Sequence, residues 1–318
     1  MLRMFKVQGN TLREDKQTDE NTKLALNSAL WIDAREPSDE EREELNTFLR
    51  AELPESDDVE EIEFSARYFQ DGVGIHVHSL FLAPGESGRH STATVAFILQ
   101  EKRLISVRDG DLADFRLLRM RARAGQVHVT SPQDLLVTMF EQKVENLADA
   151  LEDIHRKLEE VSHMVLEDAD AELEDAIDQL AKLEDSNGKI RLCLMDTQRS
   201  ISFLQRHLRE SFELQETARE IKRDVDTLMS HTAFLFDKIN FLMDSTQGFI
   251  NIEQNQIIKI FSIAAMVFLP PTVVASAYGM NFSYIPHSDW KYGFVVAVGL
   301  MLLSAVLPYW YFKRKDWL

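Results

Sequence analysis

The chain has 318 residues, and its 35 Lys and Arg against 53 Asp and Glu give a formal net charge of −18 at pH 7. This acidic balance argues against nucleic acid as a partner, because the phosphates would repel it. The single cysteine, Cys193, excludes an intramolecular disulfide framework and a multi-cysteine zinc or iron–sulfur site. The charge is spread unevenly: residues 257–318 carry a net charge of +3, whereas residues 1–256 carry −21. We therefore interpret an acidic body and a nearly neutral tail separately.

Residues 1–125 alternate short runs rich in Val, Ile and Phe with helical segments, which predicts an α/β domain. Ser38 and Glu41 have the spacing of a capping box that opens a helix after Pro37. The segment 84–88 predicts the turn of a hairpin. The predicted strands are Leu2–Val7, Ala29–Asp33, Gly74–Leu82, Ala93–Leu99 and Leu104–Val107.

Residues 126–256 have the character of a stalk of long, coiled-coil-like helices. Pro132 suits the first turn of a helix capped by Ser131, and the next proline is Pro270. We predict helices at 132–165, 170–207 and 213–278, the third about 100 Å long. A helix of that length cannot be covered by its own small domain, so we expect it to pack against copies of itself. Its heptad seam, which repeats at steps of four and three, is Leu214, Ala218, Ile221, Val225, Leu228, Thr232, Leu235, Ile239, Leu242, Thr246 and Phe249.

Two uncharged segments of the tail are each long enough to cross a hydrocarbon core. Residues 260–277 form an uncharged run of 18 residues, and residues 292–312 form one of 21 residues. We predict a transmembrane helix at 257–278, an outer loop at 279–291 and a second transmembrane helix at 292–312. Tryptophan and tyrosine at both ends of the second span are typical of membrane interfaces. Pro270-Pro271 is expected to bend the first span.

The charges next to the spans predict an orientation. Lys313-Arg314-Lys315 follows the second span, and a basic cluster of this kind belongs on the cytoplasmic side. The first 15 residues lack the apolar segment of a signal peptide, so we expect the acidic body to stay in the cytoplasm. Both termini are then cytoplasmic, residues 313–318 form a basic cytoplasmic tail, and the membrane is the inner (plasma) membrane. The predicted fold class is an α+β cytoplasmic domain followed by long α-helices and a two-helix transmembrane hairpin.

An enzyme is not indicated. The sequence contains no Walker loop, Rossmann glycine run or nucleophile elbow, and we expect no catalytic residues and no organic cofactor. His76 and His78 lie two residues apart in a predicted strand and therefore share a face. Two such histidines can start a metal site, but spacing indicates no third ligand, and we favour surface histidines.

A channel is better supported. One or two spans per chain cannot enclose a pore, so symmetry must supply the wall, and the first span is the natural lining because it continues the long helix. Its small or apolar face suits an ion that keeps its water shell, as Mg²⁺ does, and apolar rings at Ile258 and Leu269 would gate by dewetting. Ordinary helix packing through small residues is the alternative. This face consists of Asn255, Ile258, Ser262, Ala265, Leu269, Thr272 and Ser276.

The first span ends in Tyr278-Gly279-Met280-Asn281, where Gly279 is expected to supply a left-handed turn. With Phe282, a short loop and a second span after it, this segment resembles the Gly-Met-Asn signature of the CorA family of magnesium channels. The stretches GFINIEQNQIIKIFSIAAMVFLPPTVVASAYGMNF and KIRLCLMDTQRS are similar to the family too, as is the ending YFKRKDWL. The resemblance covers essentially the whole chain in the right order.

The resemblance implies a homopentameric funnel in which Mg²⁺, and also Co²⁺ and Ni²⁺, pass through one central pore. The ions would enter the cell passively, with Asn281 binding hydrated Mg²⁺. The implied selectivity filter is Tyr278, Gly279, Met280 and Asn281. The implied pore lining and gate are Asn255, Ile258, Leu269 and Thr272, with Asp244 at the cytoplasmic mouth.

The resemblance also implies regulation, because the family closes when cytoplasmic Mg²⁺ binds between neighbouring domains. The nearest matches for that regulatory metal site are Glu61 and Glu220, where better known members have Asp. A ligand that binds only the closed form shifts the population toward it.

The outer loop departs from the family pattern Met-Pro-Glu-Leu, because His287 stands in place of the glutamate and leaves Asp289 as the only acid there. Imidazole suits zinc, cobalt or nickel, so a zinc-type transporter of the same superfamily is an alternative function. A membrane-anchored helical sensor or scaffold without a pore is a second alternative, which the acidic body and the long helices fit.

Overall fold

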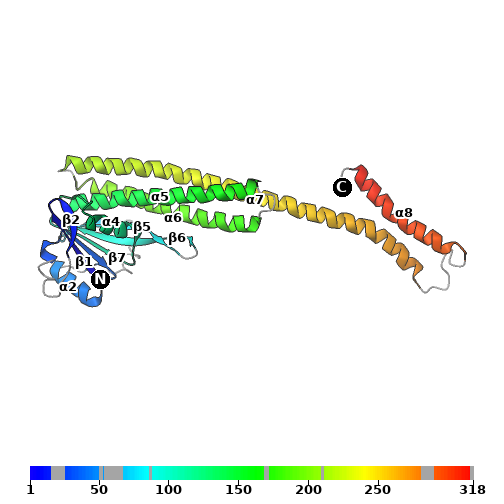
Figure 1. Cartoon of the computed structure of the whole chain (residues 1–318), viewed down its shortest axis with the longest axis horizontal. Coiled ribbons are helices and arrows are strands. Elements are labelled where there is room, and N and C mark those ends of the chain that lie inside the picture. Colours follow the sequence, from blue (N-terminus) through cyan, green and yellow to red (C-terminus); the bar gives the residue numbers. More distant parts are fainter. Residues whose placement is uncertain are drawn as a thin grey trace. The chain divides into compact units, whose positions relative to one another are not determined.

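The computed structural model describes residues 1–15, 26–49, 53, 67–85, 88–167, 172–208, 211–280 and 290–315. These residues form two compact units, Met1–Met243 and Asp244–Leu318. The first unit contains a sheet, shorter helices and the stalk helices, and the second contains the predicted membrane spans (Figure 1). We describe each unit by itself.

The first unit is built on a seven-stranded mixed sheet with the order β2-β1-β3-β7-β6-β5-β4. The pair β3–β7 is parallel, and the other described pairs are antiparallel. The five predicted strands are present, and the predicted hairpin joins β5 to β6. The two strands that we did not predict, β2 and β4, are the edges of the sheet. The strands are β1 (Leu2–Gln8), β2 (Thr11–Asp15), β3 (Trp31–Arg35), β4 (Tyr68–Gln70), β5 (Ile75–Pro84), β6 (His90–Leu99) and β7 (Leu104–Arg108).

Two helices begin where local capping chemistry predicts. The Ser38 amide donates to Glu41 Oε2 at 3.0 Å, and the Glu41 amide donates to Ser38 Oγ at 3.3 Å, which completes the capping box of α2. The Asp134 amide donates to Ser131 Oγ at 3.1 Å and so caps the helix that starts at Pro132. The helices are α2 (Asp39–Leu49), α4 (Ala113–Arg123), α5 (Pro132–Glu167), α6 (Leu173–Leu204), α7 (Phe212–Tyr278) and α8 (Gly293–Arg314).

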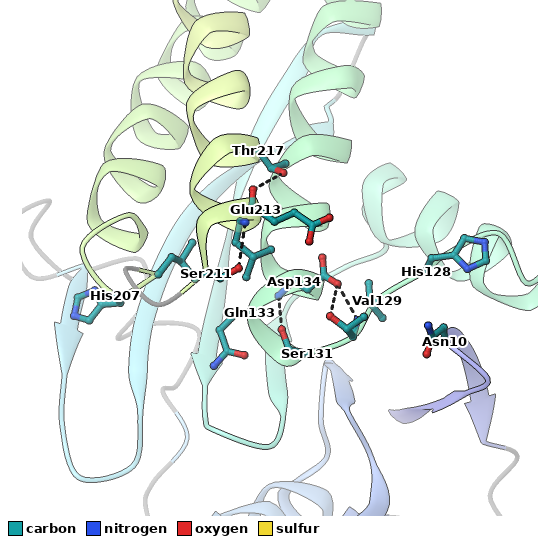
Figure 2. A pocket seen from close by; sticks show the side chains of 13 residues that line it. Asn10, His128, Val129, Ser131, Gln133, Asp134, His207, Ser211, Glu213 and Thr217 are labelled. Carbon is teal, nitrogen blue, oxygen red and sulfur yellow. Dashed lines mark hydrogen bonds between the residues drawn. The ribbon is translucent and has the colours of Figure 1, made fainter.

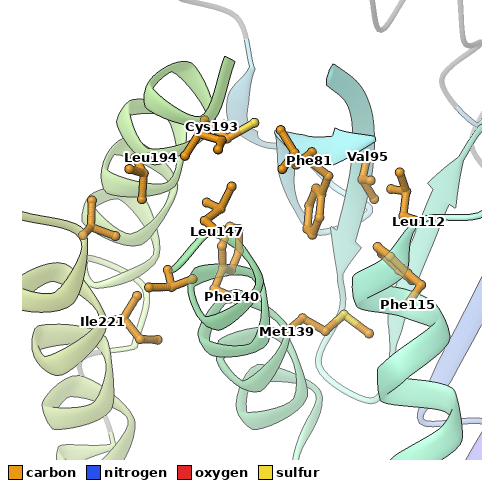
Figure 3. Packing of buried hydrophobic residues seen from close by; sticks show 14 of the residues in the cluster. Phe81, Val95, Leu112, Phe115, Met139, Phe140, Leu147, Cys193, Leu194 and Ile221 are labelled. Carbon is orange, nitrogen blue, oxygen red and sulfur yellow. The ribbon is translucent and has the colours of Figure 1, made fainter. Parts of the chain in front are cut away.

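Helices cover both faces of the sheet. On one face, Leu45 and Leu49 of α2 pack on buried side chains of β1, β3, β6 and β7. On the other face, α4, α5 and α6 build the larger core, in which Phe81, Phe115 and Phe140 lie together (Figure 3). Cys193 is buried in this core, and burial raises the pKa of its thiol to about 12, so it is a packing residue.

The heptad seam of α7 has a different role from the one we predicted. Ala218, Val225, Leu235 and Ile239 are fully buried within the single chain, where they join the core formed by α5 and α6. Apolar residues become mostly exposed from Phe249 onward. The prediction that this seam packs against copies of itself is therefore wrong for residues 218–242, because the chain's own helices cover it.

The expectation that His76 and His78 are surface residues is also wrong. Their exposed fractions are 6% and 1%. Both lie on β5, where His76 pairs with Ile98 and His78 with Ala96 of β6, two buried residues on one face of the sheet. Burial, together with the neighbouring His76 and Arg67, lowers the pKa of His78 to about 4, so that its ring is neutral at pH 7.

Candidate functional site

The apolar part of α7 has no cover within its own chain. Helices α7 and α8 are both long and apolar enough to cross a membrane, and no residue in the most apolar window of α7 is buried. Phe261, Phe268 and Leu269 are 71%, 70% and 60% exposed. A core helix of a soluble protein would bury such side chains, so this surface needs lipid or another chain against it.

Helix α7 continues through Pro270 and Pro271. Proline has no amide hydrogen, so the carbonyls of Met266 and Val267 lack their usual donors four residues on. Thr272, which follows the two prolines, does not supply a donor to either carbonyl. Its hydroxyl Oγ1 donates to the Phe268 carbonyl of the same helix at 2.7 Å. The lone pairs of the Thr272 oxygen remain available as acceptors.

The predicted filter starts where α7 ends at Tyr278. Gly279 donates its amide to the Ala275 carbonyl at 2.9 Å, and Met280 is 49% exposed. Asn281 lies outside the described residues, as do His287 and Asp289 of the outer loop. Gly279 does not adopt the left-handed conformation that we expected. A Cβ at this position would lie 3.2 Å from the Ala275 carbonyl oxygen, so close approach of the last helical turn favours glycine here.

The predicted lining residues share one face of α7. Successive residues advance by about 100° around a helix, so positions 244, 255, 258, 269 and 272 fall within an arc of roughly 100°. All five side chains are exposed: Asp244, Asn255, Ile258, Leu269 and Thr272. The stripe combines one carboxylate, one amide, one hydroxyl and two apolar side chains on a surface that the single chain does not cover.

Glu220, one of the two predicted regulatory residues, lies in an acidic groove of about 300 Å³ between α5 and α7. Glu141 and Glu145 face it from α5, and Asp224 lies one turn further along α7. Burial in the groove raises the pKa of Glu141. The negative charges of Glu145, Glu220 and Asp224 raise it further. The other predicted residue, Glu61, lies outside the described residues.

Sequence reasoning missed Glu141, Glu145 and Asp224. The available signal was the spacing of four residues within both acidic pairs, 141 with 145 and 220 with 224, which places each pair on one helix face. The two pairs face each other only because α7 packs on α5, and this packing cannot be read from the spacing of residues in the sequence.

A larger cavity, of about 730 Å³, lies where the starts of α5 and α7 meet the end of α6. Its polar groups serve the helix starts: Asp134 Oδ2 accepts from the Thr130 amide at 2.8 Å, and Ser211 Oγ accepts from the Leu214 amide at 3.4 Å (Figure 2). None of the predicted site residues that the structure describes lines this cavity. We therefore attribute the polar side chains that line this cavity to helix capping.

Comparison with known proteins is consistent with this arrangement. A family model described as "CorA-like Mg2+ transporter protein" matches residues 27–314. The chain is 48% identical to the magnesium transport protein CorA of Pasteurella multocida over 301 residues, which cover 94% of this chain and 95% of the relative. It is 44% identical to the magnesium transport protein CorA of Escherichia coli (strain K12), with full coverage of both chains.

Solved structures share the fold. The complete CorA magnesium transporter of Methanocaldococcus jannaschii superposes with a TM-score of 0.75 at 18% identity, covering 100% of this chain and 99% of the other. The full-length CmaX protein gives a TM-score of 0.68 at 17% identity, with 100% and 98% coverage. The match along the sequence, the mixed sheet with long helices and the two apolar helices agree, and the chain belongs to the CorA family of Mg²⁺ transporters.

Proposed function

We propose that this chain is the subunit of a passive Mg²⁺ channel, in which α7 lines the pore and Mg²⁺ bound to the cytoplasmic domains closes it. One observation carries the proposal: the uncovered apolar end of α7 leads directly into Tyr278-Gly279-Met280-Asn281. Relatives that match this chain over their full length are named magnesium transport proteins. Transport of an ion down its gradient needs no catalytic group and no organic cofactor.

Two membrane helices cannot surround a pore, so further copies complete the wall. We propose a homopentameric funnel, as the resemblance to the family implies. The exposed stripe of Asp244, Asn255, Ile258, Leu269 and Thr272 supports this assembly, because five such stripes around one axis form rings of like residues. The aromatic and aliphatic side chains on the rest of α7 and on α8 then face lipid or neighbouring helices.

The rings suit a hydrated divalent cation. Asp244 attracts cations at the cytoplasmic mouth, and the neutral oxygens of Asn255 and Thr272 bind water molecules of a hydrated ion. Apolar rings at Ile258 and Leu269 exclude water when they narrow, which gives a gate. Asn281, in a filter formed with Tyr278, Gly279 and Met280, receives the hydrated Mg²⁺ from outside, and Co²⁺ and Ni²⁺ take the same path.

Closure follows from the acidity of the cytoplasmic domains. We propose that Glu220, with Glu61 of a neighbouring copy, binds Mg²⁺ when its cytoplasmic concentration rises. The acidic groove around Glu220 supports this role, because its carboxylates repel one another until a divalent cation neutralises them. A cation that binds only the closed arrangement stabilises that arrangement.

The proposed location is the inner (plasma) membrane, with both termini in the cytoplasm. Lys313 and Arg314 in the last turn of α8 support this orientation, because basic residues next to a span favour the cytoplasmic side. Trp290 and Tyr292 at the start of α8, and Trp310 near its end, fit the two membrane interfaces.

The test is Mg²⁺ uptake into proteoliposomes that contain a Mg²⁺-sensitive dye, with the full chain and with Asn281→Ala. The parent should load the vesicles, and Asn281→Ala should lose most of this uptake. Asn240→Ala is the matched control, since Asn240 is an exposed asparagine of α7 within the first unit. The control should transport like the parent. Uptake by Asn281→Ala equal to that of the parent would overturn the filter assignment.

A further inference from the structure

We propose that His76 and His78 of β5, oriented by Asp71, bind a divalent transition-metal ion such as Ni²⁺, Co²⁺ or Zn²⁺. This site lies in the first unit, on the sheet, whereas the proposed ion pathway lies in the second unit. The inference does not depend on the channel function.

The two histidines share one face of β5, because side chains two residues apart in a strand point the same way. Phe69 of β4 pairs with His76 in the sheet, and the two rings stack with centroids 4.3 Å apart and planes 9° apart. The same phenyl ring makes a T-shaped contact with the His78 ring, at a centroid distance of 6.0 Å and an interplanar angle of 76°. Phe69 therefore holds both imidazoles in defined orientations beside each other.

Asp71 fixes the hydrogen on the His76 ring. His76 Nε2 lies 3.1 Å from Asp71 Oδ1, and a carboxylate only accepts, so Nε2 carries the hydrogen. Asp71 Oδ1 is held in turn by the Val73 amide at 2.8 Å and the Gly74 amide at 3.0 Å. The other nitrogen, His76 Nδ1, is left with a lone pair. A histidine whose second nitrogen donates to a carboxylate is the usual arrangement of a metal ligand.

That lone pair is buried and has no partner. Within the described part of the chain, His76 Nδ1 and both ring nitrogens of His78 lack a hydrogen-bond partner. Buried polar atoms are nearly always satisfied in folded proteins, and unsatisfied ones often mark an ion or a water that the structure does not contain. Two unpartnered imidazoles on one strand face, in residues that are 6% and 1% exposed, therefore point to a bound species.

The donors select the class of ion. Neutral imidazole nitrogens suit nickel, cobalt and zinc, whereas magnesium and calcium prefer oxygen ligands. No third histidine, cysteine or carboxylate of the described residues joins the group, so water would complete the coordination. The nearby Arg67 guanidinium is a competing charge, but its Nη1 lies 3.7 Å from Asp196 Oδ1, which offsets it.

The experiment measures metal bound to the purified full chain in mild detergent, by equilibrium dialysis against Ni²⁺ in a large excess of Mg²⁺. The excess Mg²⁺ occupies oxygen-rich sites, so the Ni²⁺ that remains bound to the protein is bound at sites with nitrogen ligands. The parent should bind one Ni²⁺ per chain that His78→Leu and His76→Leu both lose. Asp71→Asn should weaken the affinity by about 10- to 100-fold, because it removes the carboxylate behind the ligand.

His163→Leu is the matched control, because His163 is an exposed histidine on α5 that pairs with Glu167. It should bind Ni²⁺ like the parent. Thermal melting without metal verifies that each variant is folded. If the leucine variants do not fold, Asp71→Asn still tests the proposal, because it changes only a surface turn. Ni²⁺ binding by His78→Leu and Asp71→Asn at the affinity of the parent would overturn the proposal. A parent without a Ni²⁺ site would overturn it as well, and a water molecule would then be the species between the rings.

Discussion

Lys143 on α5 and Asp196 on α6 form an ion pair in the interior, with 3.7 Å between Lys143 Nζ and Asp196 Oδ2 and side chains only 1% and 0% exposed. Lys143 also donates to Ser79 Oγ of β5 at 2.9 Å, and Asp196 accepts from the Leu80 amide at 2.8 Å. Burial lowers the pKa of Lys143, and the Asp196 charge opposes that shift. The pair therefore joins two long helices to the sheet at one point.

Lys143→Met should destabilise the first unit strongly, because it leaves the Asp196 carboxylate buried with less positive charge beside it. Loss of one partner of a buried pair costs about 3–5 kcal/mol, which thermal melting in detergent would detect as a lower Tm. Lys182→Met is the control, since Lys182 pairs with Asp178 at the surface and should cost about 1 kcal/mol or less. Equal melting of the two variants would contradict the role of the pair.

Asp114 should make stability depend on pH. Burial raises its pKa to about 6, whereas an unfolded aspartate titrates near pH 4. Between these values the folded chain keeps a proton that the unfolded chain has lost, so stability falls as pH rises, by roughly 2–3 kcal/mol above pH 6. Asp114→Asn should therefore melt at a higher temperature than the parent at pH 7.5, and the difference should vanish near pH 4.

The control for this pH dependence is the exposed Asp109→Asn, whose melting should follow that of the parent at each pH. A parallel pH profile for the parent and Asp114→Asn would show that this carboxyl is not the cause.

Glu141→Gln should change the response of the fold to Mg²⁺. The pKa of Glu141 is raised, so its charge opposes folding at pH 7, and this penalty disappears as pH falls through the raised pKa. Without Mg²⁺ the variant should have a higher Tm than the parent, and added Mg²⁺ should raise the Tm less. Glu152→Gln, on an exposed position of α5, should keep the full Mg²⁺ response. The same Mg²⁺-induced rise in Glu141→Gln and the parent would exclude the groove as a cation site.

Leu269→Ser should weaken the proposed gate. A hydroxyl in a narrow apolar ring keeps water in the constriction, so Mg²⁺ uptake should continue when trapped Mg²⁺ is high enough to stop the parent. Leu302→Ser is the control, because Leu302 is an exposed leucine of α8 and should leave closure intact. If Leu269→Ser closes as completely as the parent, the gate lies elsewhere on α7.

Local sequence signals predicted much of the fold. The capping box of α2, the Ser131 cap of α5 and five strands depend on residues close together in the chain, and these features are present. The edge strands β2 and β4 escaped prediction because one is mostly polar and the other has three residues. Polar edges are common in sheets, since they limit pairing with other chains.

The site was less predictable, because it depends on packing between distant segments. The heptad of α7 indicated a partner helix but not whether the partner belongs to the same chain, and residues 218–242 pack against helices of the same chain. Spacing placed the residues from Asn255 to Ser276 on one helix face, whereas Asp244 was implied by the family resemblance. The acidic groove required α5 to meet α7, and the burial of His76 and His78 depends on the sheet face that they share with Ile98 and Ala96.

The most direct test of the account is Mg²⁺ current through the reconstituted full chain in a planar bilayer, while Mg²⁺ on the side of the acidic body is raised. With Mg²⁺ as the only divalent cation present, a current is expected, and it falls as Mg²⁺ on that side increases. It also predicts that Glu220→Gln weakens this closure without abolishing the current. Absence of any Mg²⁺ current from correctly assembled protein would contradict the channel, and a current that does not respond to Mg²⁺ on that side would contradict the closure.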